Sequence, residues 1–342
     1  MVTRPVLTSL ALLSVVALAA CGQSSANPAS SGASTPAGES SFPVTIKHAL
    51  GETTISKKPQ RVATVAWANH EVPLALGVVP VGMSKATWGD DDQDGVLPWV
   101  EEKLTELGAE TPVLFDETDG VPFEQVADTR PDVILAAYSG ITQEDYQKLS
   151  KIAPVVAYPD TPWGTTLDET IRLNSEAIGL KAEGEKLVTD LEATVDEMVA
   201  RHSSLKGRTA LFASIDATDA SKVGFYTTHD PRAAFLTEEL GMKTPKAVEK
   251  ATAGTSEFWQ QISSEQGDQL ADVDLAIAYG DAKTVPTWQK DRLLTKIPFV
   301  AKGQVAVLQN NTPLAAAANP SPLSIEWGLE DYLDLMQAAA QK

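Results

Sequence analysis

The chain has 342 residues, with 27 lysines and arginines against 46 aspartates and glutamates, and its formal net charge at pH 7 is −19. So acidic a surface disfavours nucleic acid and anionic lipid headgroups as partners. Cys21 is the only cysteine, so no disulfide can form within the chain and the fold must be stabilised by apolar burial.

The first residues are typical of an exported lipoprotein. Arg4 supplies a short positive region, and the uncharged stretch 6–20 is shorter than the roughly 20 residues that span a bilayer. This stretch ends in Leu-Ala-Ala-Cys-Gly, which resembles a bacterial lipobox. We therefore predict a signal peptide over 1–20 and acylation of Cys21, with an ordinary signal peptide as the alternative. Residues 21–41 carry almost no large apolar side chain and are expected to form a flexible tether.

The rest of the chain, about 300 residues, is longer than one hydrophobic core usually serves, so two lobes are expected. The first should begin with a hairpin over 42–55 and continue with alternating strands and helices. Its predicted strands are 61–66, 79–83, 112–115, 132–137 and 155–158, and its helices begin near residues 69, 97, 122 and 142.

A proline-free segment at 181–204, with apolar residues at helical spacing, predicts one long helix between the lobes. Apolar runs that favour strands follow from residue 209 onward, and a last helix is expected over 321–339. We therefore predict an α/β fold of two Rossmann-like lobes, 42–180 and 205–342, joined by this interdomain helix. The sheets should be mostly parallel, and the ligand cleft should lie between the lobes.

One local pattern occurs in both lobes. Glu124 precedes a buried strand and then Tyr138, while Glu265 precedes a buried strand and Tyr279. Each tyrosine arrives at the carboxyl end of its strand, where open α/β sheets bind ligands.

Several segments resemble one known family. The segments PQRVATVAWANHEVPLALGVVPVGMS, PFEQVADTRPDVILAAY and KIAPVVAY are similar to the siderophore and cobalamin type of ABC-transporter substrate-binding protein, and most similar to its ferric-siderophore branch. The resemblance runs from about residue 59 to the C-terminus. It implies a monomeric receptor, not an enzyme, on the extracytoplasmic face of a bacterial membrane, which delivers its ligand to a permease. It further implies that Glu124 and Glu265 dock on the permease, although both could be ordinary acidic residues at helix starts.

A ferric siderophore is bulky and coordinatively complete, so its receptor needs aromatic walls and a few donors rather than iron ligands. Arg232 is expected to attract an anionic complex, so that its loss should weaken an anionic siderophore far more than a neutral one. Each aromatic residue, taken singly, is also compatible with a place in the core or at the rim. The candidate ligand-binding residues are Trp67, Lys85, Trp88, Tyr138 and Trp163 in the first lobe and Tyr226, Arg232, Tyr279 and Trp288 in the second.

Other functions have weaker support. Capture of a bare metal ion needs clustered histidines and carboxylates, and of the four histidines only His70 and His229 are expected near the cleft. Haem, which such residues could ligate axially, is one alternative ligand, and cobalamin is another.

A membrane-anchored hydrolase is the alternative from another class of protein. The Ser-x-x-Lys match at 203–206 lacks the partner motifs of penicillin-binding enzymes, and we expect no catalysis and no cofactor.

One acidic loop matches a calcium-binding pattern. Asp90, Asp92, Asp94 and Glu101 stand at EF-hand spacing. Against this interpretation, no helix is predicted before Asp90, and Pro98 occupies a position that usually carries a polar group. A solvated acidic loop is the alternative.

Overall fold

The computed structural model describes residues 42–216 and 219–342. The predicted signal peptide, lipobox and tether lie outside this part of the chain. Within these two described ranges, no helix combines the length and the apolar character needed to cross a membrane.

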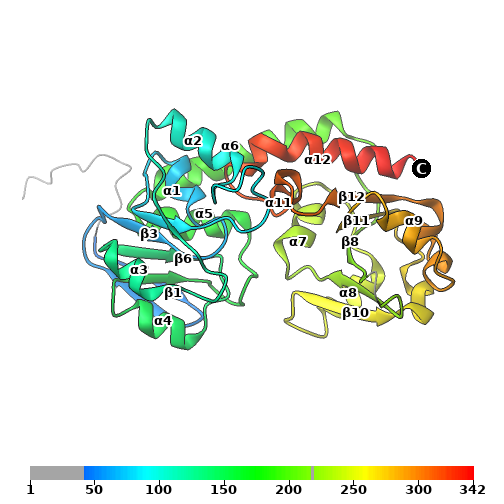
Figure 1. Ribbon diagram of the computed structural model, residues 1–342, viewed down its shortest axis with the longest axis horizontal. Helices are drawn as coiled ribbons and strands as arrows, with labels where there is room; N and C mark the ends of the chain where they lie inside the picture. Colours follow the sequence, from blue (N-terminus) through cyan, green and yellow to red (C-terminus); the bar gives the residue numbers. More distant parts are fainter. Residues whose placement is uncertain (1–41, 217–218) are drawn as a thin grey trace, which may run out of the picture. The chain divides into compact units, whose positions relative to one another are not determined.

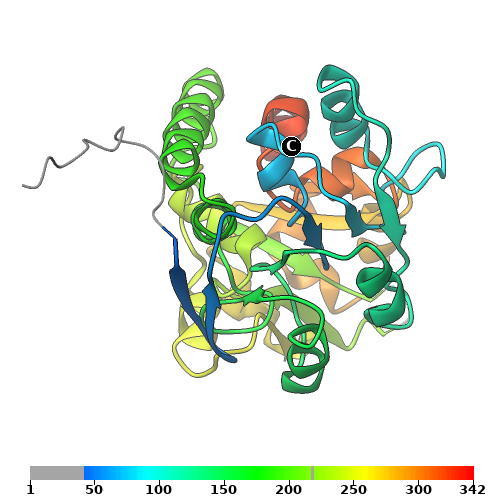
Figure 2. The ribbon, with the colours of Figure 1, turned by 90° about the vertical axis from the view of Figure 1, so that its left-hand side faces the viewer.

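The first lobe is built on a five-stranded parallel sheet with strand order β5-β4-β3-β6-β7, preceded by the antiparallel hairpin β1-β2 (Figure 1). Strand β6 is buried along its whole length because both sheet faces are covered. The helices of the first lobe lie on either side of the sheet (Figure 2). The strands are β1 (Val44–His48), β2 (Gly51–Ile55), β3 (Val62–Thr64), β4 (Gly82–Ser84), β5 (Val113–Phe115), β6 (Val133–Ala136) and β7 (Val155–Ala157).

Helices α3 and α4 cover one face of this sheet, while α5 and the hairpin cover the other. Helices α4 and α5 begin with capping boxes, in which Thr142 pairs with Asp145 and Thr166 with Glu169. The helices of this lobe are α1 (Glu71–Ala75), α2 (Pro98–Glu106), α3 (Phe123–Asp128), α4 (Gln143–Leu149) and α5 (Leu167–Ala177).

The second lobe has a five-stranded sheet of order β10-β9-β8-β11-β12. Strands β8, β11 and β12 are parallel to one another, whereas β9 is antiparallel to both of its neighbours, β8 and β10. Successive residues of β8 pack into the two hydrophobic cores on opposite faces of the sheet, because side chains alternate along a strand. Strand β10 was not predicted from the sequence. The strands are β8 (Ala210–Ser214), β9 (Lys222–Tyr226), β10 (Trp259–Ser263), β11 (Leu275–Gly280) and β12 (Val305–Gln309).

Helices α6, α7, α11 and α12 pack on one face of this sheet, and α8, α9, α10 and the 3-10 helix η1 pack on the other. A second 3-10 turn, η2 (Leu294–Lys296), precedes α10. The helices are α7 (Pro231–Glu238), α8 (Lys246–Thr252), η1 (Ser264–Leu270), α9 (Thr284–Trp288), α10 (Pro298–Lys302), α11 (Pro313–Ala317) and α12 (Ser324–Ala340).

The long helix predicted between the lobes is α6 (Lys181–Arg201), so the predicted fold class is confirmed. The structure adds a second link. Helix α12 packs along α6 (Figure 1), and Trp327 near its start contacts Trp99 of α2 in the first lobe, with ring centroids 5.1 Å apart. The lobes are therefore linked by the chain through α6 and by the contact of α12 with the first lobe. The lobe boundaries at residues 180 and 204 stay a prediction.

Candidate functional site

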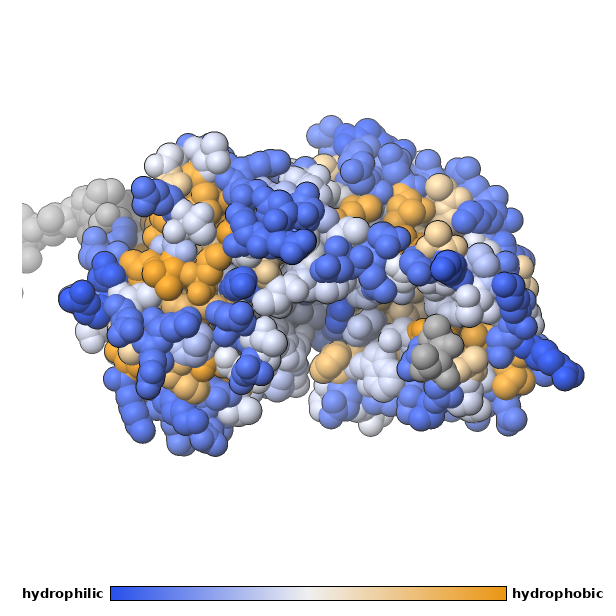
Figure 3. All heavy atoms as spheres, viewed as in Figure 1, coloured by the Kyte–Doolittle hydropathy of each residue, from blue (hydrophilic) through white to orange (hydrophobic). Residues whose placement is uncertain are grey.

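A cavity of about 260 Å³ lies between the lobes and is lined by residues from both of them. Trp67 follows β3, and Tyr279 is the last residue but one of β11 in the other sheet. The surface is hollowed between the lobes in Figure 3. None of the five lining residues is a histidine, cysteine or carboxylate, so the lining offers contacts to the periphery of a ligand rather than metal ligation. These residues are Trp67, Trp88, Arg232, Tyr279 and Asn319.

Arg232 is held by a buried partner. The side chain of Asp230 caps α7 and accepts hydrogen bonds from Nε and Nη2 of Arg232, at 2.8 and 2.7 Å. Only 1% of the Asp230 side chain is exposed. The guanidinium stacks 4.0 Å from the ring centroid of Tyr226, and Tyr279 lines the same cavity. Burial alone would lower the pKa of Arg232, but the hydrogen bonds and charge of Asp230 raise it well above its usual value. The pair is therefore ionised and carries no net charge, while its remaining N–H groups stay available for acceptors.

Tyr138 connects the lobes across the cleft. Its hydroxyl accepts a hydrogen bond at 3.1 Å from the side-chain amide of Asn319, which comes from the segment after α11. Burial raises the pKa of Tyr138 to about 12, so the phenol stays protonated. Trp163 packs edge-on against Tyr138, with ring centroids 5.4 Å apart.

Backbone strain is concentrated at this site. Three residues other than glycine have left-handed conformations beside the cleft: Ala66 with φ 63°, Ala68 with φ 59° and Trp163 with φ 60°. Non-glycine residues rarely adopt such angles because Cβ approaches the following carbonyl oxygen. Strain of this kind collects where a structure must present particular side chains.

The structure brings together Trp67, Trp88, Arg232 and Tyr279, with Tyr226, Tyr138 and Trp163 directly beside them. Lys85 follows β4 and lies 3.8 Å from Asp116, in a neighbouring pocket that also contains Trp67. The prediction for Trp288 is wrong. Only 2% of its surface is exposed, because α9 turns it into the core behind the sheet of the second lobe.

The histidines offer little to a haem iron. His70 is buried, which lowers its pKa to about 4. His229 is half-buried, and its Nε2 lies 2.9 Å from the carbonyl oxygen of Thr255, so that nitrogen already has a partner.

The acidic loop gathers Asp90, Asp92 and Asp94, which place one carboxylate oxygen each within 4.8 Å of one another. These oxygens already accept backbone N–H groups of the same loop, such as Gly95 N at 2.7 Å from Asp90. The loop is therefore ordered by its own hydrogen bonds. Glu101 stands in the first turn of α2, and burial together with Asp94 raises its pKa.

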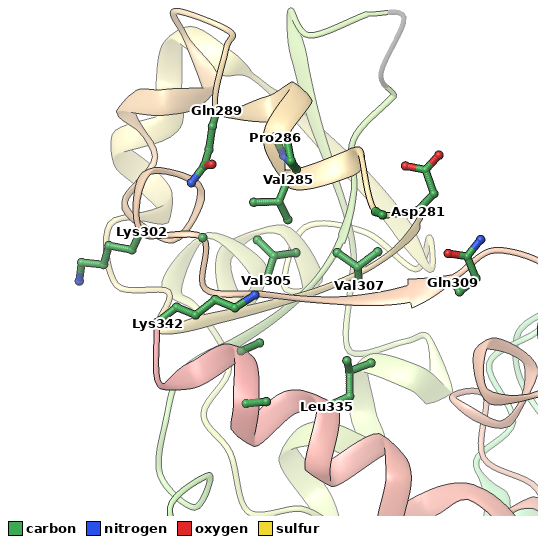
Figure 4. A pocket seen from close by; sticks show the side chains of 14 residues that line it. Asp281, Val285, Pro286, Gln289, Lys302, Val305, Val307, Gln309, Leu335 and Lys342 are labelled. Atoms are coloured by element: carbon green, nitrogen blue, oxygen red, sulfur yellow. The ribbon is translucent and has the colours of Figure 1, made fainter.

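A larger cavity, about 710 Å³, lies elsewhere, between α9, β12 and the end of α12 (Figure 4). Its apolar floor includes Val305, Val307 and Leu335, while Lys302 and Lys342 stand at one end and Asp281 at the other. No aromatic side chain belongs to the described lining, and the cavity involves only the second lobe. We therefore place the candidate site in the cleft between the lobes.

Both predicted docking glutamates are exposed. Glu124 lies in the first turn of α3 and Glu265 in the first turn of η1. Neither takes part in an ion pair within the described ranges.

Comparisons with known proteins agree on the kind of molecule. A family model described as periplasmic binding protein matches residues 62–312. A Bacillus subtilis (strain 168) protein named "Probable siderophore-binding lipoprotein YfiY" is 25% identical over 271 residues, which are 78% of this chain and 76% of that protein. The structure of PiaA from Streptococcus pneumoniae TIGR4 in complex with ferrichrome is 46% identical, with a TM-score of 0.84 over 87% of this chain and 98% of PiaA. SirA of Staphylococcus aureus, complexed with staphyloferrin B, shares the fold at 22% identity, with a TM-score of 0.63 over 87% of this chain and 98% of SirA.

Proposed function

Since this chain belongs to the periplasmic binding protein family, we propose that it is the substrate-binding lipoprotein of an ABC importer and captures a ferric siderophore in the cleft between its lobes. It binds and releases its ligand without a catalytic step. The cleft lining, with aromatic walls and one paired guanidinium, carries the proposal, because it suits a complex whose iron is already fully coordinated.

The charge balance of the cleft favours a neutral ligand. Asp230 neutralises Arg232, so the pair presents N–H donors without a net positive charge. A ferric trishydroxamate is itself neutral, because three hydroxamate anions cancel the charge of iron, and it exposes oxygen acceptors. We therefore propose a ferric hydroxamate, whereas the sequence predicted only that Arg232 would attract an anionic complex. The ferrichrome bound by PiaA, 46% identical, supports this choice.

Tryptophan fluorescence tests the ligand class. Ferrichrome should quench the fluorescence saturably with one site per chain, since Trp67 and Trp88 line the cleft. A ferric tris-catecholate of high negative charge should bind at least about tenfold more weakly, because the paired arginine gives it no uncompensated cation. Haem and cobalamin serve as comparison ligands. Saturable binding of either one without any binding of ferrichrome would contradict the proposal.

We also propose that Cys21 is acylated and anchors the chain outside the cytoplasm. The lipobox sequence supports this, as does the lipoprotein name of the Bacillus subtilis relative. The mass of the mature N-terminal peptide, with or without acyl groups, tests it.

Docking on the permease is proposed to involve Glu124 and Glu265. Reversal of both to arginine should strongly reduce iron uptake by cells while ligand affinity in solution stays unchanged, because both carboxylates are exposed and outside the cleft. Glu144→Arg with Glu326→Arg is the matched control, since these are also exposed first-turn glutamates and the change in charge is equal. Equal uptake by the two double variants would exclude the docking role.

A further inference from the structure

The loop 65–69, which follows β3, presents Trp67 to the cleft in a strained shape. Ala66 and Ala68, on either side of Trp67, both have left-handed backbone angles, with φ 63° and 59°. For a residue with a Cβ, the strain of one such conformation corresponds to about a five- to thirtyfold bias against it. The loop therefore needs contacts that select this shape.

Glu117 supplies the contact at Ala66. Its carboxylate, in the turn after β5, accepts the Ala66 N–H with both oxygens, at 3.0 and 2.9 Å. The hydroxyl of Ser84, which ends β4, lies near the same carboxylate and lowers its pKa in part. Glu117 thus ties the residues after β5 to the loop after β3, beside the carboxyl end of β4, which lies between these two strands. Burial raises its pKa to about 7, so a carboxyl group is held here although its environment disfavours the charged form.

The far end of the loop is fixed separately. The side-chain amide of Asn69 donates to Val65 O at 2.9 Å and to Tyr138 O at 2.8 Å, and its oxygen accepts Tyr138 N at 3.1 Å. With residue 69 anchored in this way, a change of the backbone at Ala66 has to be absorbed by Trp67 and Ala68, the two residues between them.

We propose that Glu117 is a positioning residue for ligand binding, which holds Ala66 in its left-handed conformation and so keeps Trp67 presented to the cleft before the ligand arrives. The inference rests on the proposed function, because it requires the cleft to be the ligand site. Glu117 does not line the cavity that we assign to the ligand, so its effect on binding passes through the loop.

The first test is ferrichrome affinity. Glu117→Ala should weaken binding by about five- to thirtyfold, because Ala66 then relaxes to a negative φ and the strain must be restored on binding. Glu117→Gln keeps one oxygen acceptor for Ala66 N–H and should bind within about threefold of the unmodified protein. Asp119→Ala, an exposed carboxylate of the same turn, is the control and should leave affinity unchanged.

Glycine at position 66 separates positioning from loss of stability. Glycine adopts positive φ about as readily as negative φ, so Glu117→Ala combined with Ala66→Gly should bind ferrichrome more tightly than Glu117→Ala alone. If the alanine variant were only destabilised, the added glycine would lower affinity further or leave it unchanged. That outcome would overturn the inference.

Hydrogen exchange of the protein without ligand provides a readout that does not depend on ferrichrome. The amide of Ala66 should exchange at least about tenfold faster in Glu117→Ala than in Asp119→Ala, because it loses its acceptor. Equal exchange in the two variants contradicts the positioning role, whatever the ligand. If the exchange difference is present but the unmodified protein does not bind ferrichrome, the assignment of ferrichrome as ligand is wrong, while the role of Glu117 in holding the loop 65–69 is supported.

Discussion

Replacing Arg232 with alanine should weaken ferrichrome binding by at least about a hundredfold and reduce the free energy of unfolding by about 3 to 5 kcal/mol. The loss of affinity follows from the removal of the donors that the guanidinium presents to the cleft. The loss of stability follows because Asp230, with 1% of its side chain exposed, loses the partner that compensates for its burial. Fluorescence titration and urea unfolding measure the two effects.

A second substitution separates these two effects. Asp230→Ala in the Arg232→Ala background removes the orphaned carboxylate, so the double variant should regain part of the stability while binding stays weak. Arg232→Lys keeps the charge but not the planar fork that pairs with both oxygens of Asp230, and it should also bind weakly. Arg292→Ala, an exposed arginine, is the control for the change in charge. Affinity near that of the unmodified protein in Arg232→Ala would show that Arg232 is only structural.

The positions of Trp67, Tyr138 and Tyr279 were predictable because strand ends can be located from apolar periodicity, and parallel strands bring their carboxyl ends to one edge. Trp288 was misplaced because its sequence position shows that it follows a strand but not which way a short helix turns its side chain.

The partners of the site were harder to predict. Asp230 had a local signal, since Asp-Pro-x at a helix start predicts an N-cap, and the capping carboxylate lies within reach of Arg232 two residues later. Glu117 had none. It lies in an acidic turn that looks solvated, and its contact with Ala66 spans 51 residues of sequence. Contacts of this kind depend on how neighbouring strand ends align, which periodicity does not specify.

The second connection between the lobes includes one buried carboxylate, Glu71 at the start of α1. It accepts hydrogen bonds from Trp99 Nε1 at 2.9 Å, from the hydroxyl of Ser321, and from the backbone N–H of Leu323 at 3.1 Å. Trp99 belongs to the first lobe, whereas Ser321 and Leu323 begin the segment that leads into α12. Glu71 therefore bonds at once to α2 and to the segment that leads into α12, beside the contact of Trp99 with Trp327.

Glu71→Ala should reduce the free energy of unfolding by at least about 3 kcal/mol, because three buried donors lose their acceptor at once. Glu71→Gln keeps an oxygen acceptor and adds an N–H group that can donate to the hydroxyl oxygen of Ser321. It should therefore reduce the free energy of unfolding by less than Glu71→Ala does. Glu102→Ala, an exposed glutamate of α2, provides the control. Urea unfolding at pH 7 measures all three, and a Glu71→Ala variant as stable as Glu102→Ala would contradict the role of Glu71.

The same residue gives the stability a dependence on pH. Burial raises the pKa of Glu71 from its usual 4.5 to about 7, although hydrogen bonds from Ser321 and Trp99 lower it in part. Between these two values the folded state keeps a proton that the unfolded chain releases, so the part of the stability that comes from this proton is present at low pH and is lost as the pH rises through about 7, while the role of Glu71 as hydrogen-bond acceptor remains. The total loss should be of the order of 2 to 3 kcal/mol. Since Glu117 titrates in the same direction, the effect of Glu71 appears as the difference in free energy of unfolding between the unmodified protein and Glu71→Gln, measured from pH 5 to pH 8. As the pH rises, the free energy of unfolding of the unmodified protein should fall relative to that of Glu71→Gln. A constant difference over this range would show that Glu71 does not change its protonation on unfolding.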